Sequence, residues 1–173
     1  MIEYTKYSEY YTELASMHVA LDEDPASIGI GSINRKIASI HAYKERTAAI
    51  LTEAIANTYE REKGHRLLKL DYDLKFEKLL ISDDQIKNLK SEGLRTAACN
   101  AKLPDEFLKM TSAEIDLNDS EGFLKVVQAK LNQLESANSN LSRQISVIEL
   151  QVEVGEISRM AGNPFSSRTL TVK

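Results

Sequence analysis

Basic side chains gather in the middle of this 173-residue chain, where their types and spacing favour phosphate chemistry. Lys and Arg at helical spacing neutralise a phosphate backbone, and several subunits around a ring would join their basic sectors into one track. The sequence therefore predicts a candidate nucleic-acid site, with an ordinary charged helix face as the alternative. The candidate residues are Lys87, Lys90, Arg95, Lys102, Arg66 and Lys69.

Residues for catalysis or metal binding form no recognisable motif. The three histidines make no H-E-x-x-H pattern, and Cys99, the single cysteine, cannot build a thiolate zinc cluster. Asp71 and Asp73 are two residues apart, so on a helix their carboxylates point in different directions. We therefore expect no enzyme activity, no catalytic residue, no metal site and no cofactor.

Composition narrows the class of protein. Apolar residues make up 42% and charged residues 28%, with only 7 Gly, 3 Pro and no Trp, which is typical of a helical chain and disfavours a β-sandwich or barrel. A single cysteine argues against a disulfide-stapled secreted scaffold. We expect a cytoplasmic protein (in a host cell if viral) without a membrane partner, because no signal peptide or apolar stretch of about 20 residues is apparent. The formal net charge of -4 argues mildly against strong nonspecific nucleic-acid binding.

The N-terminal region is predicted to be a helical arm over residues 3–21, followed by a linker over 22–32. Its apolar stripe is aromatic at one end, which indicates an arm that packs on the body or on a neighbouring subunit; a platform for stacking bases is the less favoured alternative. Proline, two glycines and acidic residues interrupt the helix, and Ser32 is the expected N-cap of the next one. The stripe comprises Tyr4, Tyr7, Tyr11, Leu14, His18 and Leu21.

A long helix is predicted from Ile33 to either Glu62 or Leu80. Gly64 weakens the longer version, because glycine costs a helix interior about 1 kcal/mol relative to alanine. Residues 68–77 alternate apolar and polar types, which is the period of a strand. No second alternating run could pair with it, so we predict helix, with a strand formed between subunits as the alternative.

The next elements are predicted from capping and breaking residues. Ser82 and Gln85 form a capping box that begins a helix over residues 83–102. Pro104 is expected to end that helix. Residues 104–119 are then expected to hold at most a short helix over 105–110, flanked by turns.

The last predicted helix, residues 120–159, carries the strongest periodic signal. Apolar residues alternate steps of three and four over more than four heptads, and Asn138 at a core position would fix the register. A helix about 60 Å long at about 1.5 Å per residue needs a long neighbour. Two pairings remain open, a hairpin with the 33–80 helix or a contact between subunits, for which charge mildly favours the parallel arrangement. The seam comprises Leu124, Val127, Leu131, Leu134, Asn138, Leu141, Ile145, Ile148 and Val152.

Together these elements predict an all-α protein built as a long helical hairpin or coiled coil. The expected divisions are an N-terminal helical arm and linker over 1–32, a coiled-coil core over 33–160 and an extended tail over 161–173. A homo-oligomer is expected, because the heptad seam is long and amphipathic.

Three stretches follow one another in an order that resembles a known family. A long charged helix precedes a polar break, a helix with Lys and Arg, and a final amphipathic helix. In this layout the chain resembles the UvsY-type recombination mediators of tailed phages, although it is net acidic and has an additional arm and tail. The stretches are Tyr43-Lys44-Glu45-Arg46 through Lys63, Lys87-Asn88-Leu89-Lys90-Ser91-Glu92-Gly93-Leu94-Arg95, and Phe123 to Ile157.

The resemblance implies a non-enzymatic oligomer that binds single-stranded DNA, a strand-exchange recombinase and a single-strand-binding protein. It makes Lys87, Lys90 and Arg95 the DNA-facing candidates. The competing hypothesis is a structural or adaptor coiled-coil protein, such as a viral assembly or inhibitory interaction factor, with no nucleic-acid binding. Its support is the acidic charge, the regular heptads and the tail.

Overall fold

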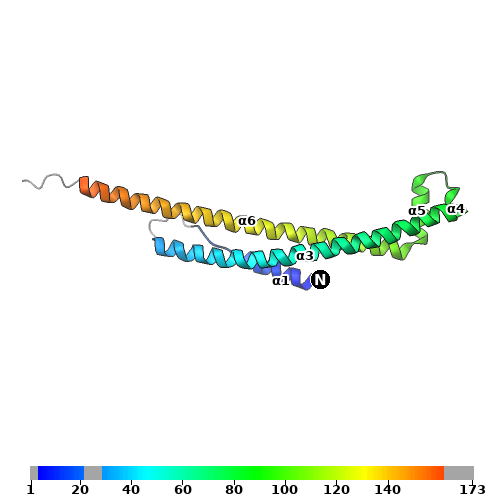
Figure 1. The fold of residues 1–173 in the computed structure, drawn as a ribbon, viewed down its shortest axis with the longest axis horizontal. Helices are drawn as coiled ribbons and strands as arrows, with labels where there is room; N and C mark the ends of the chain where they lie inside the picture. The colour runs from blue at the N-terminus through cyan, green and yellow to red at the C-terminus, as the bar shows by residue number, and fades with distance from the viewer. Residues whose placement is uncertain (1–3, 22–28, 162–173) are drawn as a thin grey trace, which may run out of the picture. The chain divides into compact units, whose positions relative to one another are not determined.

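The computed structural model describes residues 4–21 and 29–161, with side chains described over 6–21 and 29–155. Every regular element within these residues is a helix, which confirms the predicted all-α class and the long helical hairpin (Figure 1). The predicted tail begins at Ala161, which is helical, and its remaining residues lie outside the described part. The helices are α1 (Tyr4–Ser16), α3 (Ile30–Ser82), α4 (Asp84–Lys87), α5 (Glu92–Lys102) and α6 (Pro104–Ala161).

The chain divides into two compact units, and each long helix contributes a segment to both. Unit 1 combines Met1–Leu14 with Thr47–Lys130, and unit 2 combines Ala15–Arg46 with Leu131–Lys173. This division differs from the predicted arm, core and tail, because each unit joins segments that are distant in sequence.

In unit 1, α3 and α6 run antiparallel. As the residue numbers increase along α3, the residue numbers of their partners on α6 decrease, which is expected for two antiparallel helices. The cross-helix contacts are Thr58 with Ser120 at 3.1 Å, Arg61 with Asp116 at 3.5 Å, and Lys75 with Glu106 at 2.9 Å.

Helix α3 is continuous through Gly64, which confirms the longer of the two predicted versions. It begins at Ile30, so the prediction that Ser32 is its N-cap is wrong. Gly29 has a φ of 77°, a conformation that only glycine adopts at little cost, and its carbonyl accepts from the Ser32 and Ile33 amides. The helix therefore starts three residues before the predicted position.

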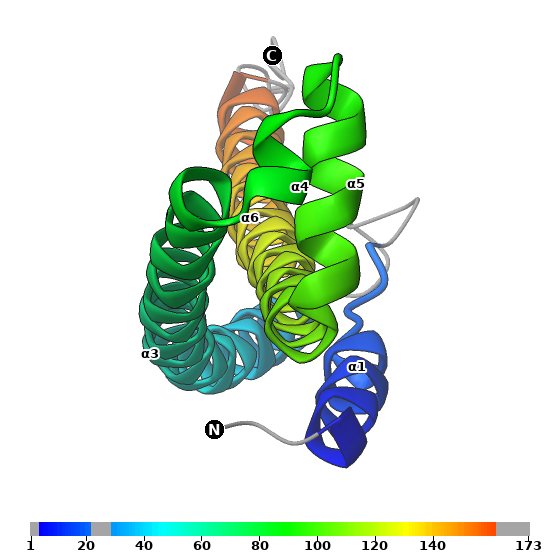
Figure 2. The same cartoon turned by 90° about the vertical axis from the view of Figure 1, so that its right-hand side faces the viewer.

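The single helix predicted over 83–102 is wrong, because residues 88–91 separate α4 from α5. Asp83 rather than Ser82 caps α4, and its carboxylate accepts from the Gln85 and Ile86 amides at 3.0 and 3.3 Å. Ser91 caps α5 through the Leu94 amide at 3.2 Å. Two competing N-caps thus divide the segment, and α4 lies against α5 (Figure 2).

Helix α6 begins at Pro104, so the prediction of a short helix and turns over 104–119 is wrong. Proline at the first helical position loses no hydrogen bond, and Asp105 and Glu106 follow in the first turn, where carboxylates complement the helix dipole. Ser120 is buried inside the helix, and its hydroxyl donates to the Leu117 carbonyl and to the Thr58 hydroxyl.

Unit 2 is built around an aliphatic core shared by the start of α3 and the later part of α6. Ile33, Ile40, Leu134, Leu141 and Ile148 form this core, each less than 9% exposed. Figure 1 shows α6 continuing past the start of α3 within this unit. The last turns of α6 therefore extend beyond the end of α3 that packs against it.

The N-terminal helix is shorter than predicted. It ends at Ser16, and residues 17–21 continue without helical structure. In this stretch Met17 is buried, Leu21 is 45% exposed, and the Ala20 carbonyl accepts from Lys36 Nζ at 2.9 Å. In residues 17–21, burial of Met17 and the hydrogen bond from Lys36 therefore take the place of the helical hydrogen bonds that the apolar spacing predicted.

Candidate interaction surfaces

The aromatic residues of α1 pack against Phe123 of α6 in unit 1. The ring centroids of Tyr7, Tyr10 and Tyr11 lie 4.7, 5.9 and 5.4 Å from that of Phe123. Tyr7 Oη accepts from Asn57 Nδ2 at 2.7 Å, and burial raises the pKa of both Tyr7 and Tyr10. Two of these rings are buried and cannot stack on bases, whereas Tyr11 is 44% exposed.

Two of the six basic candidates are paired with carboxylates of the same unit. Arg66 lies 2.5 Å from Glu62 on the same helix. Lys102 forms an ion pair with Asp83, and this contact holds the pKa of the Asp83 carboxyl below its usual range. These pairs reduce the positive potential that a phosphate backbone would meet.

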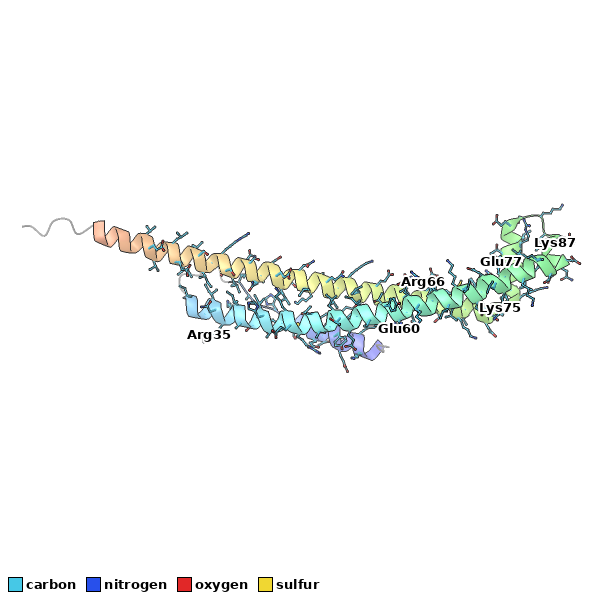
Figure 3. The ribbon with its side chains drawn as sticks, viewed as in Figure 1. Arg35, Glu60, Arg66, Lys75, Glu77 and Lys87 are labelled. Atoms are coloured by element: carbon cyan, nitrogen blue, oxygen red, sulfur yellow. The ribbon has the colours of Figure 1, made fainter. Side chains whose placement is uncertain are left out.

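Three other candidates make no ion pair within the described part of the chain: Lys69, Lys87 and Lys90. All three are exposed. Lys87 ends α4 and Lys90 lies in the connection to α5, whereas Lys69 belongs to α3. Figure 3 shows Lys87 beyond Arg66, Lys75 and Glu77, which follow one another along α3. Of these three residues, only Lys87 and Lys90 are thus close in sequence, at the end of α4 and in the connection that follows it.

Arg95, the sixth candidate, lies between α3 and α5. It lines a hollow of about 240 Å³ together with Phe76, Leu80, Glu92 and Thr96. Its side chain is half-buried, and its Nε atom is buried with no hydrogen-bond partner among the described residues. Arg95 therefore belongs to the junction of these helices and not to an exposed basic surface.

The predicted heptad seam is divided between the two units. Leu134, Leu141 and Ile148 lie in the aliphatic core of unit 2, and Ile145 packs against it. In unit 1, Val127 is buried and Leu124 is half-buried. Leu131 is also half-buried, whereas Val152 is 54% exposed. Within unit 2 the seam is thus covered largely by α3 of the same chain, which is the hairpin alternative.

Asn138 is the polar member of this seam. Its side chain is half-buried, and its Oδ1 atom is buried with no hydrogen-bond partner in the described part of the chain. A buried acceptor without a donor costs about 1–3 kcal/mol. The amide therefore lowers the stability of unit 2 unless another molecule supplies the donor.

The structure reveals an apolar surface that the sequence analysis did not identify. Leu67, Leu70, Leu74 and Ile81 are 56–76% exposed, and we call them the outer face of α3. They recur at steps of three, four and seven residues, so they share one side of the helix. The period-two run over 68–77 was the signal that could have revealed Leu70 and Leu74, because on a helix such a run places apolar side chains on two sides.

Unit 2 also exposes apolar side chains near the end of α6. Val147, Leu150, Val152 and Val154 are 51–60% exposed. Both units therefore leave large apolar side chains in contact with solvent.

Comparisons with known proteins identify no relative of this chain. No protein-family model, curated protein or solved structure matches it. Across residues 4–21 and 29–161, no helix has the length and hydropathy needed to cross a membrane. The described side chains also include no cluster of three His, Cys, Asp or Glu suited to a metal ion. The candidate surfaces must therefore be interpreted from their own chemistry.

Proposed function

We propose that this protein is a non-enzymatic, oligomeric helical scaffold that works by binding other protein surfaces, including copies of itself. The observation that carries this proposal is the outer face of α3, where four large aliphatic side chains are 56–76% exposed. Contiguous exposed apolar surface is uncommon on monomers and marks interaction sites. Burying a leucine side chain fully gains about 1.5–3 kcal/mol, so a partner would gain substantially by covering this face.

The distribution of charge also favours a protein partner. Arg66, Lys75 and Lys102 each face carboxylates of the same unit, and the chain carries a formal net charge of -4. A protein that binds mainly through phosphates presents clustered, uncompensated positive charge. The intrachain pairs therefore support association through apolar surface more than through electrostatics.

The experiment is sedimentation velocity of the full chain over a wide concentration range at physiological salt. We expect species heavier than the 19.4 kDa monomer, with a fraction that rises with concentration. A single monomeric species at every concentration would overturn the proposal.

Single-stranded DNA binding by such an oligomer is the second candidate function, supported by Lys69, Lys87 and Lys90, which are exposed and form no ion pair with the described residues. It agrees with the resemblance to UvsY-type mediators, in which a recombinase and a single-strand-binding protein would be further partners. Anisotropy of a labelled oligonucleotide should then rise with protein and weaken steeply with salt. Lys87→Glu with Lys90→Glu should abolish binding, whereas Lys44→Glu in unit 2 should not; no binding at low salt would exclude this candidate.

A further inference from the structure

The alternating run in α3 gives the helix two apolar sides. Residues two apart on a helix are rotated by about 200°, so each apolar residue of the run faces nearly opposite to the next apolar residue. Tyr72 is buried and Leu68 is half-buried on one side, whereas Leu70 and Leu74 are 56% and 60% exposed on the other. The inner side packs within unit 1, and Tyr72 donates a hydrogen bond to Asn100 of α5. The outer side has no such partner among the described residues.

The outer face of α3 follows a heptad pattern. Leu67, Leu74 and Ile81 are seven apart and occupy position a, and Leu70 occupies position d. Glu77 is the next d position, and it is exposed. This is the pattern of a helix that pairs with another helix in register, with one charged residue in the seam.

The flanking charges favour one arrangement. Position g holds Arg66 and Asp73, and position e holds Asp71 and Lys78. In a parallel pair each g residue faces the e residue five positions later on the other helix. Arg66 would then face Asp71 of the second copy, and Asp73 would face Lys78 of the second copy. Every one of these contacts joins opposite charges.

An antiparallel pair lacks this complementarity. Centred on Leu70 and Leu74, it opposes Asp71 to Asp71 of the second copy and Asp73 to Asp73 of the second copy. It also places Leu67 against Glu77. Asp73 and Lys78 are exposed and form no ion pair within the described chain, so both remain available to a second copy.

We propose that the outer face of α3 binds the same face of a second copy of this chain, with the two α3 helices parallel. This assignment rests on the proposed scaffold function and specifies its first contact. Glu77 would face Glu77 of the second copy, so the seam contains one repulsive layer that limits the affinity. The contact uses residues of unit 1 only.

The first test is sedimentation velocity of Leu70→Asp with Leu74→Asp. Both side chains are exposed, so the variant should keep its helical circular dichroism, while self-association weakens at least tenfold. Leu108→Asp on α6, which replaces a side chain that is 68% exposed in the same unit, is the matched control and should associate like the wild type. Unchanged association of the double variant would overturn the assignment.

The second test addresses orientation. Asp73→Lys and Lys78→Asp each create like-charge contacts in a parallel homodimer, so each variant alone should associate less than the wild type. An equimolar mixture should recover association, because each g residue then meets an opposite charge on the other chain. A mixture no stronger than its components would overturn the parallel arrangement.

Glu77→Leu supplies a gain-of-association test. Removing the repulsive layer should lower the dissociation constant at least tenfold if two copies of this face meet, and an unchanged constant would contradict the contact. Failures of the two proposals are distinguishable. A wild type that associates while Leu70→Asp with Leu74→Asp associates equally well refutes only this surface, whereas a monomeric wild type refutes the scaffold function as well.

Discussion

The two units stabilise their helix pairs by different chemistry. In unit 1 the contacts between α3 and α6 include polar groups, such as buried Arg61 with Asp116 and the Lys75–Glu106 ion pair. In unit 2 the core is aliphatic, and Lys44 forms an ion pair with Glu135 across the two helices at 3.4 Å. Directional contacts can define the helix register in unit 1, whereas packing must define it in unit 2.

This difference teaches where the stability of each unit resides. An aliphatic seam gains free energy from area removed from water and tolerates small shifts. A buried polar contact gains little on balance but is costly to break, because the remaining group stays desolvated. Changes to volume should therefore affect unit 2 most, and changes to hydrogen bonding should affect unit 1 most.

The largest effect should come from Leu141→Ala in unit 2. Leu141 is fully buried, so the substitution removes apolar contact and leaves a cavity, and the free energy of unfolding should fall by about 2–5 kcal/mol. Urea unfolding followed by circular dichroism measures the change. Leu150→Ala, at a side chain that is 59% exposed, should change it by about 0.5 kcal/mol or less; equal effects would contradict the aliphatic core.

Arg61→Met should have the next largest effect, in unit 1. The guanidinium lies against the carboxylate and the carbonyl of Asp116 at 3.5 and 3.3 Å, and its removal should cost about 1–3 kcal/mol in the same unfolding assay. Arg66→Met removes an exposed pair and should cost about 0.5 kcal/mol or less. If both variants unfold at the same urea concentration, the polar contact does not stabilise unit 1.

Asn138→Leu should stabilise unit 2. The substitution removes a buried carbonyl oxygen that has no donor among the described residues, and the free energy of unfolding should rise by about 1 kcal/mol. Gln133→Leu, at an exposed position on the same helix, is the control and should have little effect. A loss of stability in Asn138→Leu at concentrations where the chain associates would indicate that a second copy pairs with this amide.

Acid should weaken unit 1 through two carboxylates. Lys102 lowers the pKa of Asp83, and Lys75 lowers that of Glu106. A carboxylate with a lowered folded pKa stabilises the fold above its unfolded value, about 4, and loses that contribution as the pH falls through the folded value. Urea midpoints between pH 6 and pH 2 should therefore fall less in Asp83→Asn with Glu106→Gln than in the wild type; identical slopes would refute this origin.

The smallest perturbation uses Cys99 as a reporter of unit 1. The thiol is buried. Burial is the main cause that raises its pKa, and the negative charge of Asp83 raises it further. Reaction with a thiol reagent at pH 8 should therefore be slow in the folded protein and fast in urea. Leu141→Ala should leave this rate unchanged if unit 1 stays folded, whereas rapid labelling of the native wild type would contradict the burial.

Particular residues show how far the sequence could predict the fold. The apolar period from Leu134 to Ile148 was visible in the sequence, because Leu134, Leu141 and Ile148 recur every seven residues and all three lie in the aliphatic core of unit 2. The start of α6 was not, because Pro104 can end one helix or begin another, and only the contacts of the following turns decide between these outcomes. One such contact joins Ser120 to Thr58, which is distant in sequence.

The candidate surfaces were predicted less completely. The basic residues were visible in the sequence, but the pairing of Arg66 with Glu62 and of Lys102 with Asp83 was only partly visible. Glu62 lies four residues from Arg66, so that pair could be expected on a helix. Asp83 and Lys102 are distant in sequence and come together because the chain turns between α4 and α5. The outer face of α3 was present as an alternating run, but alternation does not tell a strand from a helix with two apolar sides.

The sequence by itself determined the helical class and the long heptad seam, because these follow from composition and from local periodicity. The tertiary structure alone decided which side of each helix is covered. Burial of Tyr72 and exposure of Leu70 depend on where α5 and α6 pack, and that choice removes only one side of α3 from water in this unit. The apolar side chains left over by this choice are the surface that we assign to a second copy.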